Sequence, residues 1–250
     1  MKKLNGIVLG VANDKSIAYA VAKKFSENGG SVVASCLNQK AFDVVAPLTR
    51  PYGISLQCCD VEKEGELEAF VQTAVAALGQ IDFVVHSIAW APIGDLHGRV
   101  VDSASTGFAR AMDVSCHSFA RVAKLVAPYM ANGGSMVTMS YLGSDEVVPH
   151  YGLMGPVKAA LESLVKYMAA ELGPQGIRVH AVSPGPIATR AASGIQAFDE
   201  LMSSAIQKAP LGRLVSTEEV AALTEFLCSP QSSGMTGQTI FVDAGVHAVD

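Results

Sequence analysis

The sequence predicts a single α/β domain built on a doubly wound parallel sheet of about seven strands, and three observations support this. The chain has 250 residues, a length that such folds reach without dividing into smaller domains. Half of the residues are hydrophobic and the mean hydropathy is +0.32, which indicates a large core. Short β-branched runs alternate with longer helical patterns, and almost continuously apolar strands are typical of a parallel sheet covered by helices on both faces.

The expected elements alternate from the start of the chain. The first strand, Ile7–Leu9, ends at Gly10, and a helix over Ile17–Phe25 stops at the helix-ending signal Asn28-Gly29-Gly30. A polar and mixed stretch separates the second strand from the third. Further strands are expected over Val32–Ala34, Ile54–Cys59, Ile81–His86, Ser135–Met139, Ile177–Val182 and Thr239–Val242. Further helices are expected over Glu62–Leu78, Ser105–Met130, Val157–Leu172 and Thr217–Leu227, and no repeat or linker divides the region 1–250.

Net charge and cysteine usage exclude several classes of function. A net charge of −5 and a pI near 5.7 give no electrostatic footprint for nucleic acid. No apolar run reaches the roughly 18 residues that a membrane helix needs. We interpret the apolar start of the chain as a first buried strand rather than a signal peptide. The five cysteines and six histidines lack metal-ligand spacing. They predict buried thiols in a reducing cytoplasm and no metal site.

The stretch from Tyr141 to Lys158 is the strongest candidate for a catalytic site. It joins an expected strand to an expected helix, and ligands bind at that edge of open α/β sheets. Seven positions separate Tyr151 from Lys158, and on an ideal helix they lie about 20° apart with a rise of roughly 10.5 Å. A lysine on the same face lowers the pKa of a tyrosine, which can then donate to an oxygen that becomes anionic. The alternative is a surface tyrosine and a solvated lysine.

The segments after the first three strands are candidates for dinucleotide binding. Gly10 allows close approach of a diphosphate, and the helix starting near Ser16 offers free amides and a positive dipole end. The general fingerprint has three glycines where this chain has one. The second strand ends without an acid for the ribose or an arginine for a 2′-phosphate, so Lys40 is either a phosphate partner or solvated. Asp60 either accepts from the adenine amine or caps a helix.

The segment Gly185–Gln207 is long and carries Pro186 and the small-residue run Ala191–Gly194. It regains helical character near Phe198. Long segments at the ligand edge are often lids. We therefore expect either a lid or an ordinary crossover connection here.

With these motifs placed, the chain resembles the bacterial enoyl-acyl-carrier-protein reductases, a divergent branch of the short-chain dehydrogenases and reductases. The likeness runs essentially from end to end. The resemblance rests on five motifs: Gly10-x5-Ser16-Ile17-Ala18, His86-Ser87-Ile88, Ser140-Tyr141-Leu142-Gly143, Tyr151-x6-Lys158, and Gly185-Pro186-Ile187 through Ala191–Ile195. In ordinary short-chain reductases the lysine would stand at position 155, which is glycine here. That spacing and the additional Tyr141 favour an enoyl reductase over a ketoreductase.

The resemblance implies a Rossmann-like fold and a set of site residues. Tyr151 would hydrogen-bond the substrate carbonyl, Tyr141 would be the second active-site tyrosine, and Lys158 would bind the nicotinamide ribose. Ala91 matches a substrate contact. The positions matched to the dinucleotide are Gly10, Ser16, Ile17, Leu37, Asp60, Val61, Ile88, Lys158, Ile187, Ala188, Thr189, Arg190 and Ala191.

The resemblance also implies the reaction and its setting. A trans-2-enoyl thioester on acyl carrier protein would be reduced at its carbon–carbon double bond during fatty acid synthesis. The cofactor would be NADH, with NADPH possible. The assembly would be a homotetramer, with a mobile substrate loop at about 187–207.

This chain departs from the family pattern at several positions. Leu37 stands where many relatives have glutamine, Ala89 replaces a glycine, and Trp90 replaces the usual phenylalanine. Pro156 fits most easily in the first turn of a helix, which would start the helix near Gly155 and leave Tyr151 before it. The alternatives are a short-chain ketoreductase, a reductase of enoyl-coenzyme A, and a catalytically idle dinucleotide-binding protein.

Overall fold

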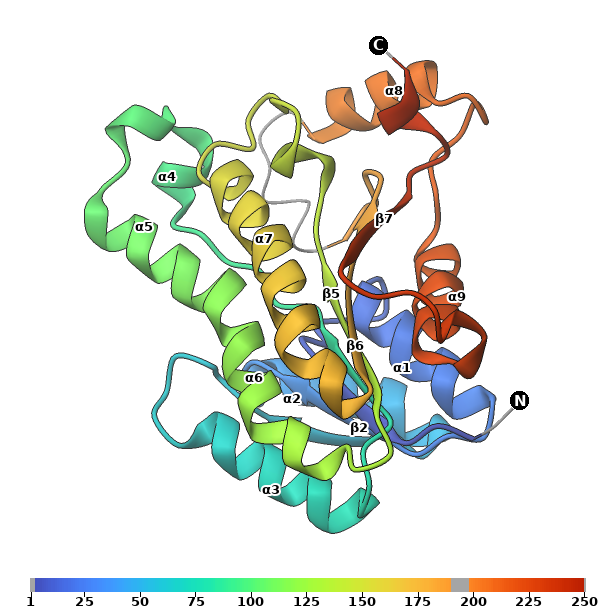
Figure 1. Ribbon diagram of the computed structural model, residues 1–250. Coiled ribbons are helices and arrows are strands. Elements are labelled where there is room, and N and C mark those ends of the chain that lie inside the picture. The colour runs from blue at the N-terminus through green and yellow to red at the C-terminus, as the bar shows by residue number, and fades with distance from the viewer. Residues whose placement is uncertain (1–2, 190–197, 250) are drawn as a thin grey trace.

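The computed structural model describes residues 3–189 and 198–249, and these form one domain around a parallel sheet (Figure 1). Within the described residues the sheet has seven strands in the order β3-β2-β1-β4-β5-β6-β7. Chain order therefore runs outward in both directions from the boundary between β1 and β4, which confirms the doubly wound prediction. The strands are β1 Gly6–Leu9, β2 Val32–Cys36, β3 Ser55–Cys58, β4 Phe83–His86, β5 Gly134–Met139, β6 Ile177–Pro184 and β7 Gln238–Val242.

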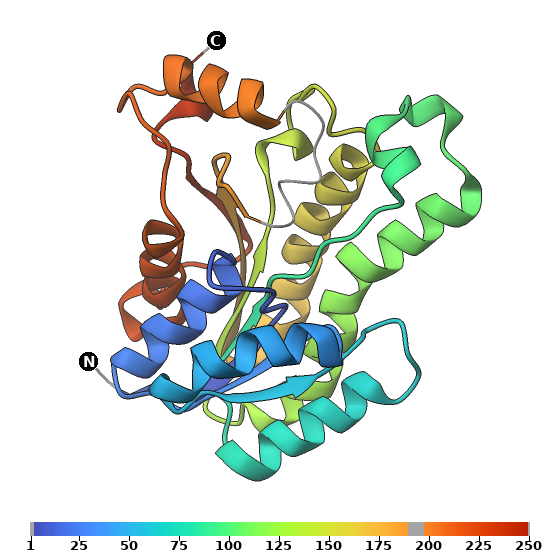
Figure 2. The same cartoon turned by 180° about the vertical axis from the view of Figure 1, so that it is seen from behind.

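Helices cover both faces of the sheet. Side chains along β1 point alternately to the two faces, and because both faces are covered, all of these side chains are apolar. Ile7 and Leu9 point into the core beneath α3, α6 and α7, whereas Val8 points into the core beneath α1 and α9. The second view shows α1 on the face opposite α7 (Figure 2). The helices are α1 Ile17–Glu27, α2 Gln39–Thr49, α3 Glu66–Leu78, α4 Ile93–His97, α5 Ser105–Met112, α6 Ser118–Val126, α7 Met154–Leu172, α8 Phe198–Lys208 and α9 Thr217–Cys228.

Two expectations about helices need correction. The mixed stretch after β2 forms α2, whose N-cap Asn38 accepts a hydrogen bond from the Ala41 amide at 3.0 Å. Pro47 inside that helix and its partly exposed apolar residues hide the helical pattern. The expected helix Ser105–Met130 consists of α5 and α6, joined by a π-helical turn at Asp113–His117 and followed by a short 3₁₀ turn.

Two further corrections concern the edge of the sheet near β3. The helix expected from Glu62 begins at Glu66, because Gly65 precedes it in a left-handed conformation with φ 80°. Asp60 is therefore no helix cap; its Oδ1 accepts from the Glu62 amide at 3.1 Å inside a turn. All five cysteines are free, but Cys58 is exposed because β3 is an outer strand. Across residues 3–189 and 198–249, no helix combines the length and apolar character needed to span a bilayer.

Candidate active site

Gly10 and Ile88 meet where the strand order reverses between β1 and β4. Gly10 has φ 98°, and a Cβ there would lie 2.3 Å from the Ser87 carbonyl oxygen, so only glycine fits. The same hypothetical Cβ would lie 3.3 Å from Cγ1 of Ile88. The structure thus brings together two predicted cofactor contacts at the crevice where open α/β sheets bind ligands.

Ser16 and Ile17 open helix α1 at the same edge of the sheet. Ser16 is buried; its Oγ donates to the Asn13 carbonyl at 2.7 Å and accepts from the Tyr19 amide at 3.3 Å. This cap fixes the start of α1, whose unpaired amides and dipole favour an anion such as a diphosphate.

The predicted adenosine contacts lie on the outer strands. Leu37 follows β2 and is 56% exposed, and Lys40 lies exposed in the first turn of α2. Asp60 and Val61 follow β3, with Val61 buried and its carbonyl accepting from Arg121 at 2.9 Å. Leu37 and Lys40 leave this end of the site open to solvent, and side chains hold its backbone, since the Asp60 amide donates to Glu66 Oε2 at 2.8 Å.

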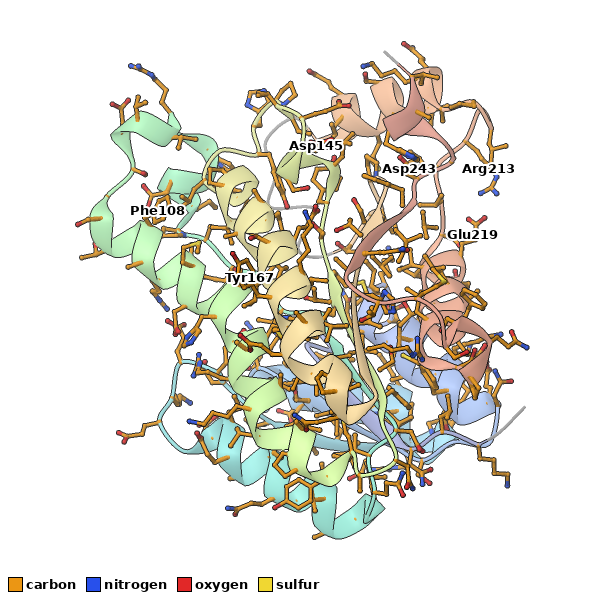
Figure 3. All side chains as sticks on the ribbon, viewed as in Figure 1. Phe108, Asp145, Tyr167, Arg213, Glu219 and Asp243 are labelled. Carbon is orange, nitrogen blue, oxygen red and sulfur yellow. The ribbon has the colours of Figure 1, made fainter. Side chains whose placement is uncertain are left out.

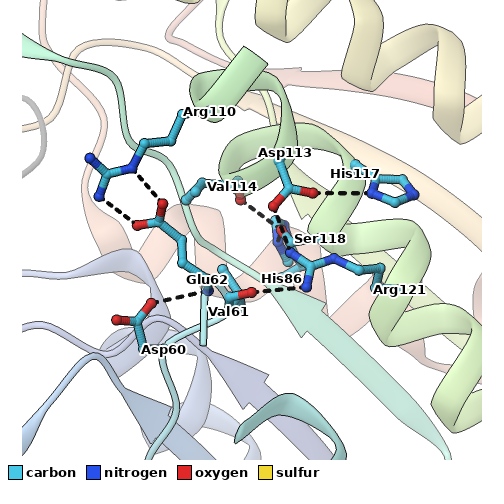
Figure 4. Close-up of polar contacts among 10 residues, drawn as sticks. All are labelled: Asp60, Val61, Glu62, His86, Arg110, Asp113, Val114, His117, Ser118 and Arg121. Atoms are coloured by element: carbon cyan, nitrogen blue, oxygen red, sulfur yellow. Dashed lines mark hydrogen bonds and ion pairs between the residues drawn. The ribbon is translucent and has the colours of Figure 1, made fainter. Parts of the chain in front are cut away.

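His86, from the motif His86-Ser87-Ile88, is a structural residue. It is fully buried at the end of β4, with Nε2 2.8 Å from Ser118 Oγ and Nδ1 3.1 Å from Thr138 Oγ1. Burial lowers its pKa to about 3, so the ring is neutral at pH 7. The Ser118 hydroxyl donates to the Val114 carbonyl and therefore accepts from Nε2 (Figure 4).

The two predicted tyrosines lie against each other at the carboxyl end of β5. The ring centroids of Tyr141 and Tyr151 are 4.8 Å apart and the rings are tilted by 59°. Gly143 makes room, since a Cβ there would lie 2.4 Å from Tyr151 Cδ1. Tyr151 itself stands between His150 with φ 61° and Gly152 with φ 42°. The backbone is therefore left-handed on both sides of Tyr151, and this turn sets the position of the tyrosine.

The expectation that Tyr151 and Lys158 share an ideal helix face is wrong. Helix α7 begins at Met154, so Tyr151 lies on the preceding turn and Pro156 lies in the first helical turn. Pro156 lacks an amide hydrogen and is tolerated there.

The predicted lowering of a tyrosine pKa by the lysine is also wrong for this structure. Burial raises the pKa of Tyr141 to about 12. Burial, together with the neighbouring Tyr141, raises the pKa of Tyr151. Both phenols therefore stay protonated at neutral pH and serve as hydrogen-bond donors.

Lys158 is buried in the first turns of α7, with only 4% of its surface exposed. Its Nζ donates to the Met139 carbonyl at 2.6 Å, at the end of β5. Burial lowers its pKa to about 8, against the opposing effects of Cys116 and Glu162. An ammonium has three donors, and in the described part of the chain Nζ has this one acceptor. The remaining donors suit the hydroxyls of a ribose, so the residue fits the predicted cofactor role.

Sequence reasoning missed Glu162, one helical turn beyond Lys158. Its Oε1 accepts from Ser144 Oγ at 2.6 Å and from Ser140 Oγ. The two serines flank Tyr141, so the carboxylate ties the tyrosine segment to α7. The i, i+4 spacing from Lys158 was the available signal.

Sequence reasoning also missed the residues that hold the segment after β4. The Trp90 amide donates to Ser115 Oγ at 2.8 Å, and that hydroxyl donates to the Trp90 carbonyl at 2.8 Å. Ala91, the predicted substrate contact, follows directly and packs against the core beside α7. Ser115 is 25 positions away and lies in a π-helical turn, which no local pattern predicts.

The segment after β6 and helix α8 border a cavity beside Tyr141. Ile187, Ala188 and Thr189 follow β6 at this edge, while Arg190 and Ala191 lie outside the described residues. The cavity has a volume of about 130 Å³ and is lined by Tyr141, Val148, Ser183, Leu201 and Phe241, among others. A cavity of about 220 Å³ near Leu4 and Pro230 lies away from the site, at the end of the sheet where β1 begins.

Fold and site together define a doubly wound α/β protein with its ligand crevice at the reversal of strand order. The family model of the enoyl-(acyl carrier protein) reductases matches residues 10–247. An NADH enoyl-acyl-carrier-protein reductase of Rhizobium meliloti is 42% identical over 100% of this chain and 92% of its own length. The corresponding Bacillus subtilis protein is 37% identical, with 97% and 95% covered.

Solved structures agree with this. A reductase of this kind from Anaplasma phagocytophilum, in complex with NAD, is 39% identical with a TM-score of 0.95, covering 100% of this chain and 95% of that one. One from Bacillus cereus, with NADP⁺ and an indole naphthyridinone, is 36% identical with a TM-score of 0.96, covering 100% and 98%. The chain belongs to the enoyl-acyl-carrier-protein reductase family. The predicted resemblance is confirmed.

Proposed function

We propose that this protein reduces the carbon–carbon double bond of a trans-2-enoyl thioester carried by acyl carrier protein, using NADH. The observation that carries the proposal is a pair of packed, protonated tyrosines, Tyr151 buried and Tyr141 partly buried, with the buried Lys158 at the same end of β5. Family membership gives the reaction class, and the fit of Lys158 to a ribose supports the cofactor.

Each part of the crevice has a matching part of NADH. Gly10, Ser16 and Ile17 would hold the diphosphate against the start of α1, and Lys158 would bind the nicotinamide ribose. Asp60 and Val61 would contact the adenine. Ile187–Thr189 would border the nicotinamide half.

The tyrosines supply the stabilising donors. NADH, when bound, supplies the hydride that is added to the β carbon of the enoyl group. Negative charge then develops on the thioester oxygen as an enolate, and the phenol of Tyr151 donates a hydrogen bond to that oxygen. A proton then adds to the α carbon, which completes the reduction of the double bond and restores the thioester carbonyl. Because its pKa is raised, Tyr151 keeps its proton and acts as a donor rather than a base. Tyr141 packs against it and limits the access of water.

One set of assays tests the function. Loss of reduced-nicotinamide absorbance is followed with a trans-2-enoyl thioester, on acyl carrier protein and on coenzyme A, and with a 3-ketoacyl thioester. We expect turnover of the enoyl substrates and none of the ketoacyl substrate. Turnover of the ketoacyl substrate alone would identify a ketoreductase, and NADH binding without turnover would identify an idle dinucleotide-binding protein.

We propose that the predicted substrate loop at about 187–207, of which residues 190–197 lie outside the described residues, acts through its helix α8, which closes over the acyl chain. Leu201 and Ala205 of α8 line the cavity beside Tyr141, so this helix is placed to cover an apolar ligand. Hydrogen exchange of the segment should slow when NAD⁺ and an acyl thioester bind together. Equal exchange with and without them would contradict this role.

We also propose a homotetramer in a reducing cytoplasm. Tyr167 on α7 and Phe108 on α5 are 70% and 37% exposed on neighbouring helices (Figure 3), which suits a surface covered by another copy. The five free thiols suit a reducing compartment. The molar mass in solution by light scattering tests the assembly, and a monomer would contradict it.

A further inference from the structure

Arg110 connects two segments that are distant in sequence. Its Cζ lies 3.9 Å from the centroid of the Trp90 ring. The same guanidinium donates to both carboxylate oxygens of Glu62, with Nη2 2.8 Å from Oε2 (Figure 4). A planar guanidinium can stack its face on a ring while its edge binds a carboxylate, which a lysine cannot do.

Both connected segments border the crevice. Glu62 follows Asp60 and Val61, and the Glu62 amide donates to Asp60 Oδ1 at 3.1 Å. Trp90 stands between Ile88, a predicted cofactor contact, and Ala91, a predicted substrate contact. Arg110 therefore has the adenosine end of the site on one side and the substrate end on the other.

The helical run that carries Arg110 also holds the backbone of Trp90. Ser115, in the π-helical turn that follows α5, bonds both the amide and the carbonyl of Trp90. Ser115 is fully buried, so this attachment is fixed. Ser115 thus bonds the backbone of Trp90, and Arg110 contacts its ring. Both residues lie in one helical run, and only the contact with the ring depends on Glu62.

An ordinary surface ion pair elsewhere in the chain provides a comparison. Arg213 also binds Glu219 through two hydrogen bonds, at 2.9 and 2.7 Å (Figure 3). The side chains of that pair are 52% and 39% exposed, close to the 53% and 30% of Arg110 and Glu62. Glu219 caps α9 by accepting from the Ser216 amide, far from the segments after β3 and β4. Arg213 is therefore a matched control for the loss of an exposed arginine.

We propose that Arg110 is a positioning residue that couples the adenosine end of the site to the substrate end. Glu62 holds the guanidinium over Trp90, and the stacked ring fixes the segment Ile88–Ala91 in the place that the enoyl thioester needs. When the adenine half of the cofactor orders Asp60–Glu62, the substrate segment is ordered with it. This inference rests on the proposed reaction.

Trp90 is the single tryptophan of the chain, so its fluorescence reports on this segment directly. The variants are Arg110→Ala, Glu62→Gln, the double variant, and Arg213→Ala as control. Without ligand, Arg110→Ala should shift the Trp90 emission to longer wavelength because the ring loses its cover. Glu62→Gln should shift it in the same direction but less, and Arg213→Ala should leave it unchanged. NAD⁺ should alter the emission of the wild type more than that of Arg110→Ala.

Steady-state kinetics then separate positioning from general destabilisation. Arg110→Ala should raise the KM for both NADH and a trans-2-octenoyl thioester about three- to fivefold, with kcat changed less than about twofold, since one stacked cation and one exposed ion pair are lost. Glu62→Gln should raise the KM for the octenoyl thioester in the wild type and should have no effect in Arg110→Ala. Thermal melting of all variants checks folding.

Unchanged emission and KM values in Arg110→Ala would overturn the proposal. An equal effect of Glu62→Gln with and without Arg110 would overturn it as well, because the two residues would then act independently. Failure of the proposed function looks different: the wild type would not turn over the octenoyl thioester, while the emission measurements with NAD⁺ would still show whether Arg110 acts on Trp90.

Discussion

The two ends of the crevice differ in how they hold polar groups. At the tyrosine end, Tyr151 and Lys158 are 8% and 4% exposed, and burial shifts the pKa values of both. At the adenosine end, Leu37 is 56% exposed and Lys40 lies in solvent. Electrostatic interactions are strong where water is excluded and weak where it is present. Chemistry should therefore depend strongly on single residues at the tyrosine end, and cofactor discrimination only weakly on single residues at the adenosine end.

The largest expected effect is at Tyr151. Tyr151→Phe removes the donor to the developing oxyanion and keeps the ring, so kcat should fall about 10²–10³-fold, while the Kd for NADH stays the same. Tyr141→Phe should have a smaller effect, because Tyr151 is the proposed donor to that oxygen, whereas Tyr141 lines the neighbouring cavity and packs against the Tyr151 ring. Single-turnover rates with an enoyl thioester provide the measurement. If Tyr141→Phe proves the more damaging change, the two roles must be exchanged.

The next effect is at Lys158, and it depends on pH. The ammonium has three charge-assisted N–H donors for ribose hydroxyls and the neutral amine has only two weaker ones, and burial lowers the pKa of Lys158 to about 8. NADH affinity should therefore be full well below pH 8 and should decrease as the pH rises through 8. Titrations of the wild type and of Lys158→Met across this range test it. Lys158→Met should bind about tenfold more weakly at neutral pH, as expected when a charged hydrogen-bond donor is lost, and should show no such pH dependence.

Glu162 should have an intermediate effect. Its carboxylate raises the pKa of Lys158 and holds Ser140 and Ser144. Glu162→Gln keeps an acceptor oxygen but removes the charge, so the loss of NADH affinity should begin at a lower pH than in the wild type. Glu162→Ala should in addition slow turnover, because the Tyr141 segment is released. The exposed neighbour Ser163 supplies the control, Ser163→Ala, which should match the wild type in both measurements.

The smallest effect is expected at Leu37. Leu37→Gln adds a hydrogen-bonding group beside the adenosine and should tighten NADH binding about two- to tenfold, the usual range for one hydrogen bond. Lys40→Ala should change the preference between NADH and NADPH by less than about tenfold, since an exposed lysine contact is weak. A hundredfold preference for NADPH in kcat/KM would contradict the comparison, because it would require a strong cationic site at this open end.

Comparison of the expected strands and helices with the observed ones shows which of them the sequence alone could predict. All seven strands of the described residues were predicted within a few residues. For β1, β2, β4, β5 and β6 the reason is that buried parallel strands are apolar on both faces. The start of α1 at Ile17 was predicted from the helical pattern over Ile17–Phe25, and the structure adds that Ser16 caps it. Helix α2 was missed because its pattern is broken by Pro47.

The sequence by itself determined the fold class and the place of the crevice, and it put Tyr141, Tyr151 and Lys158 forward as candidate site residues, because these depend on local patterns and on spacing along the chain. Tertiary structure alone decided what surrounds them. Burial, which reverses the expected direction of the tyrosine pKa shift, results from packing between β5, α7 and the segments beside them. The contacts of Arg110 join residues that are 20 and 48 positions away, and only the folded chain brings such residues within bonding distance.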